Sequence, residues 1–245
     1  QYLLIGDPNM FDEFAPLLEW KRKKGVPAEA VDVSWVYVNY PGADEQERIK
    51  ACIKDYVQNR GTLWVALAGD STIIPDRDCY GSYDNTKNIP TDLYYAGLDD
   101  MNWNDDGDDM CAESSDDTID MGPDVYVGRI PIRTEADAKA IVSKTIEYEK
   151  HVRAHNFVEK MLLYGVLLWN MGDAEGKSDY MWSDWVEPYW EGQKYRFYDT
   201  NTDFAGGAPT NGQGALAGPY YDVTIPNTNE LLMKGFNFFH IATHG

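Results

Sequence analysis

The fold follows from the run Leu63-Trp64-Val65-Ala66-Leu67-Ala68-Gly69-Asp70, in which apolar residues continue without a break up to a glycine and an aspartate. A short apolar run without polar alternation is typical of a strand that is buried on both faces. Strands of this kind occur in parallel sheets that helices cover on both sides. The run therefore predicts a mostly parallel sheet in the interior of an α/β protein.

Strands and helices alternate along the rest of the chain. Strands are expected at residues 2–5, 31–36, 63–68, 125–127, 161–169, 195–198 and 236–244. Helices are expected at residues 11–24, 44–59, 135–151, 179–190 and 229–234. This alternation indicates an α/β fold with a mostly parallel sheet. Two longer segments, 75–123 and 204–219, read as irregular, and such loops are often functional or organised by a metal.

The acidic composition limits the possible partners. The 245 residues include 41 acidic and 21 basic ones, which gives a formal net charge of −20. Binding to nucleic acid or to an anionic membrane needs positive charge, so neither is expected. No apolar run approaches the roughly 18 residues of a membrane span. The composition is typical of a secreted or cell-surface protein, or of one that neutralises its carboxylates with calcium.

The three cysteines are Cys52, Cys79 and Cys111. They lack the paired spacing of a zinc site, and they are too few for a disulfide framework. Cys52 lies in a helical pattern and is expected in the core. Cys79 and Cys111 lie in loop-like sequence and could pair with each other. The cysteines therefore predict no metal site of their own.

Acidic residues are clustered between positions 99 and 124, where no lysine or arginine interrupts them. Such a cluster repels itself unless solvent or a cation neutralises it. Within it, residues 102–113 resemble a calcium loop, with oxygen-bearing side chains at alternate positions, glycine at the sixth and glutamate at the twelfth. The candidate calcium ligands are Asn104, Asp106, Asp108, Glu113 and Asp124, with Asp70 as a further one. The alternative is a solvated acidic loop without a metal.

The last expected strand ends on a histidine, in Phe236-Asn237-Phe238-Phe239-His240-Ile241-Ala242-Thr243-His244, and Gly245 follows. At the carboxyl edge of a parallel sheet, His244 is placed to act as a general base or acid. The N–H of Gly245 is free to face a developing oxyanion. The alternative for His244 is a strand-end histidine capped by a carboxylate. Since no nucleophile follows, these residues read as the base-bearing part of a catalytic unit.

Residues 172–178 have the strand-then-helix context of a phosphate-binding loop but not its spacing. Met171 stands where the motif needs its first glycine, and Asp173 and Glu175 would repel a phosphate. Nucleotide binding is therefore not expected. Asp179, in the first turn of the following helix, either complements the helix dipole or forms the bottom of a pocket for a basic side chain.

Motifs along the whole chain carry a family resemblance. They lie at residues 2–5 with 19–25, 67–75, 91–96, 123–131, 146–150 and 243–245, and the most specific is Pro123-Asp124-Val125-Tyr126-Val127-Gly128-Arg129-Ile130-Pro131. In this order the motifs resemble the gingipain-type cysteine peptidases, family C25 of the caspase-like clan. The resemblance implies a caspase-like three-layer α/β/α fold with two sub-domains, and a Cys–His endopeptidase.

The same resemblance implies roles for individual residues. His244 and Gly245 match the catalytic His-Gly of the family, whose nucleophilic cysteine would lie in a later strand, beyond Gly245. Ser178-Asp179 matches the position at which arginine-cleaving members carry a pocket aspartate, which implies a preference for Arg or Lys at the cleaved bond. Family members also bind structural calcium around the segment that ends at residues 124–129.

We therefore predict the N-terminal part of a secreted cysteine endopeptidase that cleaves protein or peptide substrates through an acyl-enzyme. Residues 1–133 would form the first sub-domain, with the calcium-type loop at 99–124, and residues 134–245 the first part of the catalytic sub-domain. The remaining C-terminal part would supply the cysteine, so this chain alone is expected to be inactive. The alternative is a calcium-stabilised, non-catalytic binding or scaffold module of the same fold.

Overall fold

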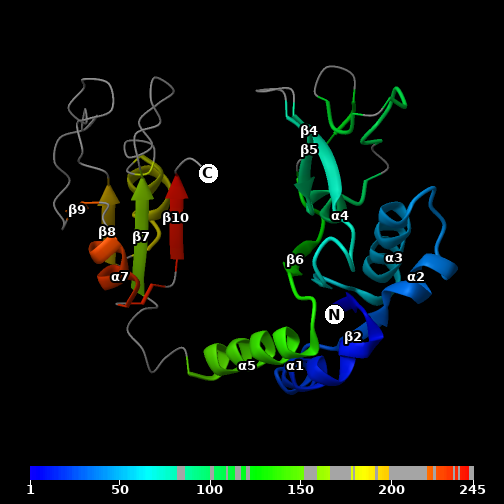
Figure 1. The fold of residues 1–245 in the computed structure, drawn as a ribbon, viewed down its shortest axis with the longest axis horizontal. Coiled ribbons are helices and arrows are strands. Elements are labelled where there is room, and N and C mark those ends of the chain that lie inside the picture. The colour runs from blue at the N-terminus through cyan, green and yellow to red at the C-terminus, as the bar shows by residue number, and fades with distance from the viewer. Residues whose placement is uncertain are drawn as a thin grey trace. The chain divides into compact units, whose positions relative to one another are not determined.

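The computed structural model describes residues 1–81, 86–99, 102–108, 110–113, 117–119, 122–151, 159–165, 178, 180–190, 193–198, 220–222, 225–233, 235–236 and 238–242. The chain divides into two structural units, Gln1–Lys150 and His151–Gly245 (Figure 1). Each unit has its own sheet and its own core.

The first unit is built on a four-stranded parallel sheet. Its strands are β1 Tyr2–Gly6, β2 Ala28–Asp32, β3 Trp64–Ala68 and β6 Tyr126–Ile130, in the order β2-β1-β3-β6. All three pairings are parallel, as the apolar run at residues 63–68 predicts. Because the strands share one direction, their carboxyl ends lie at the same edge of the sheet.

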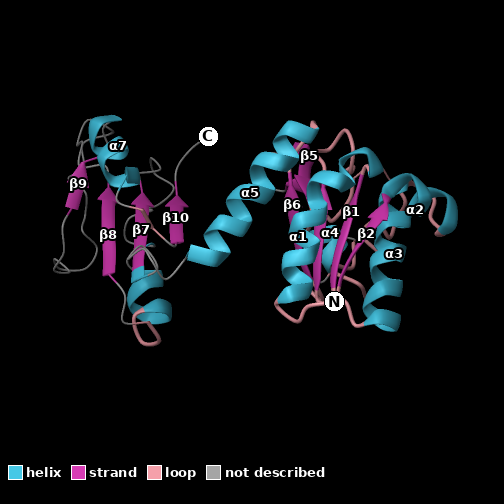
Figure 2. Ribbon diagram, turned by 90° about the horizontal axis from the view of Figure 1, so that it is seen from below, coloured by secondary structure: helices cyan, strands magenta, loops and turns pink. Residues whose placement is uncertain are grey.

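Helices cover both faces of this sheet (Figure 2). They are α1 Phe11–Lys23, α2 Val33–Asn39, α3 Glu45–Arg60 and α5 Glu135–His151. Successive residues of β1 point to opposite faces. Leu3 packs in one core with Ile49 of α3, whereas Leu4 packs in the other with Phe14 of α1 and Val142 of α5. The first unit is therefore a three-layer α/β/α structure, and the predicted fold class is confirmed.

The prediction of a strand at residues 31–36 is wrong. β2 ends at Asp32, and the following residues form α2. The Asp32 carboxylate accepts a hydrogen bond from the Ser34 N–H at 2.8 Å and so caps the first turn of this helix. Val33 and Val36, three positions apart, then lie on one buried face. The aspartate therefore ends the strand earlier than the β-branched residues alone indicate.

Part of the segment 75–123, which was expected to be irregular, has regular structure. β4 Arg77–Gly81 and β5 Thr86–Thr91 form an antiparallel hairpin, and the short helix α4 Leu93–Ala96 follows. Beyond α4, the Trp103 side chain is buried, and its ring meets that of Tyr94 edge-on with centroids 5.4 Å apart. Both rings belong to the core that contains α3, so they attach the segment to the first unit.

The second unit contains another parallel sheet. Its strands are β7 Lys160–Gly165, β8 Gln193–Tyr198, β9 Tyr220–Asp222 and β10 Phe238–Ala242, in the order β10-β7-β8-β9. Two helical elements are also described, the π-helix η5 Trp182–Val186 and α7 Ile225–Met233. Met161 and Leu163 of β7 pack with Trp182 on one face, and Leu162 packs with Phe236 on the other. Both faces of β7 are therefore covered, as its apolar sequence predicts.

The two units divide between Lys150 and His151, at the end of α5, and the expected sub-domain boundary between residues 133 and 134 stays a prediction. Ala138 and Val142 of α5 are buried in the core of the first unit, so the helix belongs to that unit. Within the described ranges, no helix combines the length and the apolar character that crossing a bilayer requires.

Arg129, near the end of β6, joins three segments at the carboxyl edge of the first sheet. Its Nε and Nη2 atoms donate to the two carboxylate oxygens of Asp92 at 2.8 and 2.6 Å. Its Nη1 atom donates to the backbone oxygens of Gly69 at 2.9 Å and of Ile74 at 2.6 Å. A bidentate, charge-assisted pair of this kind is among the stronger hydrogen-bonded contacts in proteins. The guanidinium thus connects β6 to the chain after β3 and to the end of the hairpin.

A second polar cluster joins α1 to α5. Glu149 of α5 accepts hydrogen bonds from Trp20 Nε1 at 2.8 Å, from Lys21 Nζ at 2.5 Å and from Lys24 Nζ at 2.8 Å. Burial raises the pKa of Glu149, but these three hydrogen bonds outweigh burial and lower the pKa to about 2. The ionised carboxylate therefore stabilises the packing of the two helices.

We predict that Arg129→Met lowers the free energy of unfolding by about 2–4 kcal/mol, because a largely buried carboxylate and two carbonyl oxygens lose a charged donor. Lys23→Met is the matched control, since the Lys23–Glu19 ion pair is exposed, and it should leave the free energy of unfolding nearly unchanged. Urea titrations at neutral pH measure both values. Equal losses in the two variants would contradict the role given to Arg129.

Glu149→Gln should lower the free energy of unfolding at neutral pH by about 2 kcal/mol. Because the pKa in the folded state lies below its usual value of 4.5, the contribution of the carboxylate is complete above about pH 5 and is lost as the pH falls toward about 2. The difference between wild type and Glu149→Gln should therefore shrink over this interval. Melting temperatures measured across it test this, with the exposed Glu147→Gln as control. A difference in melting temperature between wild type and Glu149→Gln that does not vary with pH would contradict the prediction.

Candidate active site

The candidate active site lies at the carboxyl edge of the second sheet. β10, β7 and β8 are parallel, and Ala242 lies in register with Gly165, which in turn lies in register with Tyr198. The three strands therefore end at one level, and their arrowheads point the same way in Figure 1. His244 follows two positions after the end of β10. His244 and Gly245 themselves lie outside the described residues, so their catalytic roles stay predictions.

β10 is the edge strand of the described sheet, and β7 is its neighbour. We expected a buried strand, but the side chains of Phe238, Phe239 and Ile241 are 56%, 40% and 59% exposed. His240 is half-buried and lies in register with Leu163 of β7. In the part of the chain that the structure describes, β10 thus has one edge without a partner strand. The apolar side chains of β10 are exposed beside that edge.

The segment around the predicted pocket aspartate is described only in part. Ser178 is fully buried, and the residues from Tyr180 onward are helical and lead into η5. Within this segment Trp182 packs edge-on against Trp190, with ring centroids 5.6 Å apart. Asp179 lies outside the described residues. Whether its carboxylate complements the helix dipole or lines a pocket therefore stays open.

Sequence reasoning missed a buried arginine in the same sheet. Arg196 of β8 is 1% exposed and is the largest of the fully buried side chains that the structure describes. It lies two positions after Lys194, so both side chains leave the same face of β8. The Lys194 ammonium lies 5.0 Å from the centroid of the Trp182 ring, which identifies this face as the one that η5 covers. The available signal was one basic residue between the aromatic residues of the expected strand at 195–198.

The predicted calcium loop is folded by its own side chains. Gly107 has a φ of +74°, the left-handed conformation that suits a glycine at the sixth position of such a loop. Asn104 Oδ1 accepts a hydrogen bond from the Gly107 N–H at 2.8 Å. Asp106 Oδ1 accepts one from the Asp108 N–H at 3.1 Å, and Asp108 Oδ1 accepts one from the Met110 N–H at 2.6 Å. Three of the predicted ligands therefore use one oxygen each to hold the turn.

The other two predicted ligands lie farther along the segment. Glu113 is 7% exposed, and its N–H donates to the Asp117 carboxylate at 2.8 Å. Asp124 accepts a hydrogen bond from the Leu98 N–H at 2.6 Å, which holds the pKa of that carboxyl below its usual value. Asp124 thus attaches the end of the segment to Leu98, whereas the Glu113 N–H makes a local contact within the segment.

The donor set nevertheless has the chemistry of a site for a hard cation, because all five candidates offer oxygen atoms and the segment contains no basic residue. Among the described residues, no three His, Cys, Asp or Glu side chains are arranged to hold a metal ion. Asp70, the further candidate, forms an ion pair with Arg133 and accepts a hydrogen bond from the Thr72 N–H at 3.0 Å. Calcium binding in this segment therefore stays a prediction.

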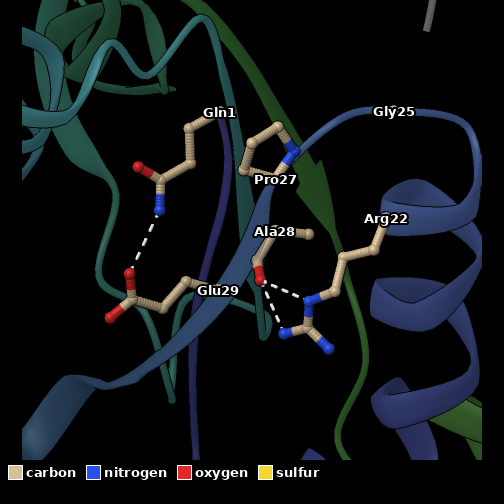
Figure 3. A pocket seen from close by; sticks show the side chains of 6 residues that line it. All are labelled: Gln1, Arg22, Gly25, Pro27, Ala28 and Glu29. Atoms are coloured by element: carbon tan, nitrogen blue, oxygen red, sulfur yellow. Dashed lines mark hydrogen bonds between the residues drawn. The ribbon is translucent and has the colours of Figure 1, made fainter.

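A pocket of 610 Å³ lies at the other, amino-terminal edge of the first sheet (Figure 3). Arg22 donates two hydrogen bonds to the Ala28 oxygen, at 3.0 and 2.6 Å, and Gln1 Nε2 donates to Glu29 Oε2 at 3.1 Å. These polar groups satisfy one another. Open α/β sheets bind ligands at the carboxyl ends of their strands. The pocket is therefore not a candidate for the chemistry.

The solved structures that resemble the whole of this chain include two with a TM-score of 0.65. One is a complex of the pro- and mature domains of Porphyromonas gingivalis RgpB, at 15% sequence identity and a TM-score of 0.65. The other is the Arg-specific cysteine proteinase gingipain R (RgpB), at 16% identity and a TM-score of 0.65. Both matches cover 100% of this chain, which spans 48% and 47% of those two chains. At such low identity the likeness shows the fold.

An uncharacterized protein from Archaeoglobus fulgidus is 20% identical in an alignment of 178 residues, and the match covers 66% of this chain and 38% of that protein. The chain therefore spans less than half the length of the relatives it matches. The family model of peptidase family C25 matches residues 1–245, the full length of the sequence. The match includes all the motifs and both four-stranded sheets. The chain therefore belongs to peptidase family C25.

Proposed function

We propose that this chain is the N-terminal part of the catalytic domain of a secreted cysteine endopeptidase. The observation that carries the proposal is the common edge at which β10, β7 and β8 end. Two residues beyond β10, His244 is available for proton transfer and the Gly245 N–H for binding an oxyanion. Membership of a peptidase family supports the same reaction class.

We propose that the nucleophilic cysteine lies C-terminal to Gly245, as the family resemblance implies. Burial raises the pKa of the Cys52 thiol to about 12, and a hydrogen bond with Cys111 raises the pKa of the Cys79 thiol. A nucleophilic cysteine needs an accessible thiolate, which such thiols do not provide. We propose that the nucleophile follows a strand that pairs with the free edge of β10 and covers its apolar side chains.

The reaction would run through a thioester. The thiolate attacks the carbonyl carbon of the scissile bond, and the Gly245 N–H donates to the oxygen that becomes negative. His244, which holds the proton taken from the cysteine thiol, gives it to the leaving amine as the C–N bond breaks. It then takes a proton from water, whose oxygen attacks the thioester and releases the carboxylic acid and the thiol. The residues of this chain would thus supply the proton transfer and part of the oxyanion site.

We further propose a preference for Arg or Lys at the cleaved bond. Ser178 is buried, and the next residue, Asp179, would offer a carboxylate to a guanidinium or an ammonium group. One structure with this fold is described as Arg-specific. The net charge of −20 would in addition attract basic substrates.

Calcium is the cation proposed for the segment 99–124. Oxygen ligands and the absence of basic residues favour a hard cation over a transition metal. Asn104, Asp106, Asp108, Glu113 and Asp124 would share its coordination with backbone oxygens. The ion would neutralise carboxylates that otherwise repel one another, and so would act on stability rather than in the reaction.

The direct test labels the full-length protein with a thiol-reactive peptide that ends in arginine. We expect modification of a single cysteine C-terminal to Gly245, and a labelling rate that falls by about 100-fold or more in His244→Ala. His151→Ala, at an exposed helix end, is the matched control and should label like the wild type. Mass spectrometry of the digested protein locates and quantifies the modification.

The same experiment tests the specificity and the competing function. Asp179→Asn should slow labelling by the arginine peptide while leaving labelling by an uncharged norleucine peptide unchanged. Labelling spread over many cysteines, or equal in wild type and His244→Ala, would refute the peptidase and support the non-catalytic scaffold of the same fold.

Removal of calcium by a chelator should lower the melting temperature by on the order of 5 °C or more. The shift should be absent in Asp106→Asn/Glu113→Gln and kept in Asp12→Asn, an acid on α1 far from the segment in sequence. Calorimetry before and after chelation measures it. A melting temperature that chelation leaves unchanged would rule out a stabilising calcium ion.

A further inference from the structure

Two cysteines from separate segments meet beside strand β4 of the hairpin. Cys79 Sγ of β4 lies 3.9 Å from Cys111 Sγ of the acidic segment, and 32 positions separate the two residues in sequence. Cys79 is buried, Cys111 is half-buried, and both are free thiols. Two thiols at this distance are nearly in van der Waals contact.

The backbone, and not only the side chains, brings these residues together. The Tyr80 N–H, one position after Cys79, donates to the Cys111 oxygen at 2.8 Å. On the other side of Cys111, the Ala112 N–H donates to the Trp103 oxygen at 2.7 Å. Since Trp103 is buried in the core, the segment that carries Cys111 is held from both directions. Disulfides form where the backbones already lie this close, because the Cα atoms of a cystine are about 4.4–6.8 Å apart.

We propose that Cys79 and Cys111 are a site of disulfide formation, which closes residues 79–111 into a covalent ring and ties the acidic segment to the hairpin. The oxidant is a small-molecule disulfide of the glutathione class, as found in the oxidising environments of exported proteins. The proposal rests on contacts within the first unit and is independent of the catalytic function.

The exchange proceeds in two balanced steps. The more exposed thiol, Cys111, loses its proton, and its sulfur attacks one sulfur of the oxidant, whose S–S bond breaks to release one thiolate. Cys79 then passes its proton to solvent, attacks the Cys111 sulfur of the mixed disulfide and displaces the second thiolate. Both thiolates take up the protons released, so that one oxidant is reduced to two thiols as the protein gains one S–S bond.

Cys52 provides a control within the same molecule. It is fully buried in α3. Among the described residues, the sulfur–sulfur contact joins Cys79 to Cys111 and does not include Cys52. Its thiol should therefore stay reduced under conditions that oxidise the pair.

The test incubates the full chain with oxidised glutathione, alkylates the remaining thiols in denaturant and digests with trypsin. Cys79 and Cys111 fall in the neighbouring tryptic peptides 78–87 and 88–129, and Cys52 falls in 51–54. We expect 78–87 and 88–129 to appear as one species that reduction separates, and 51–54 to appear alkylated. Recovery of the first two peptides only as alkylated or glutathione-bound single chains would overturn the proposal.

The Cys79→Ser variant separates ring closure from mere reactivity. It should retain glutathione on Cys111 instead of releasing it, whereas Cys52→Ser should form the linked peptides as the wild type does. Oxidation of the wild type should also raise the melting temperature by on the order of 5–10 °C, and this rise should be missing in Cys79→Ser. An equal rise in melting temperature in wild type and Cys79→Ser would contradict the proposal, because the variant cannot form the bond between residues 79 and 111.

Discussion

The common direction of the strands in each main sheet is the constraint on which the rest of the structure depends. Every pairing in the two four-stranded sheets is parallel, so the chain returns through a crossover and all carboxyl ends collect at one edge. In the first unit this edge holds the Arg129 cluster, and in the second it holds the end of β10. Segments that follow strands at such an edge can carry chemistry while the buried strands stay unchanged.

The motifs that carry the family resemblance meet in space in the first unit. Trp20 of α1 contacts Glu149 of α5, and Asp92 before α4 contacts Arg129 of β6. Both contacts place a charged group in a largely buried position, where loss of its partner leaves a charge without compensation. The residues of these motifs therefore stabilise the fold of the first unit. The proposed chemistry belongs to the second unit, where the strand edge leads to the His-Gly sequence.

Sequence reasoning succeeded where one periodicity dominates and failed where a single contact decides. The helix α5 was predicted at its observed bounds, Glu135–His151, because its apolar spacing is uninterrupted. The end of β2 was missed because Val33 and Val36 favour a strand locally, while the capping hydrogen bond of Asp32 favours a helix. The exposure of β10 was missed because a sequence does not report which neighbour covers a strand. The calcium ligands stay unresolved because carboxylates such as Asp108 also bind nearby backbone N–H groups.

The central claim is that the end of β10 delivers an imidazole to a sulfur that a neighbouring strand supplies. A crystal structure of the full-length protein measures it most directly, through the distance from the ring nitrogens of His244 to the nearest cysteine Sγ. The account predicts a distance within about 4 Å, with the cysteine after a strand that pairs with the free edge of β10. An imidazole turned into the core, with every sulfur more than about 8 Å away, would contradict the account, since hydrogen-bond reach is required of a base and its nucleophile.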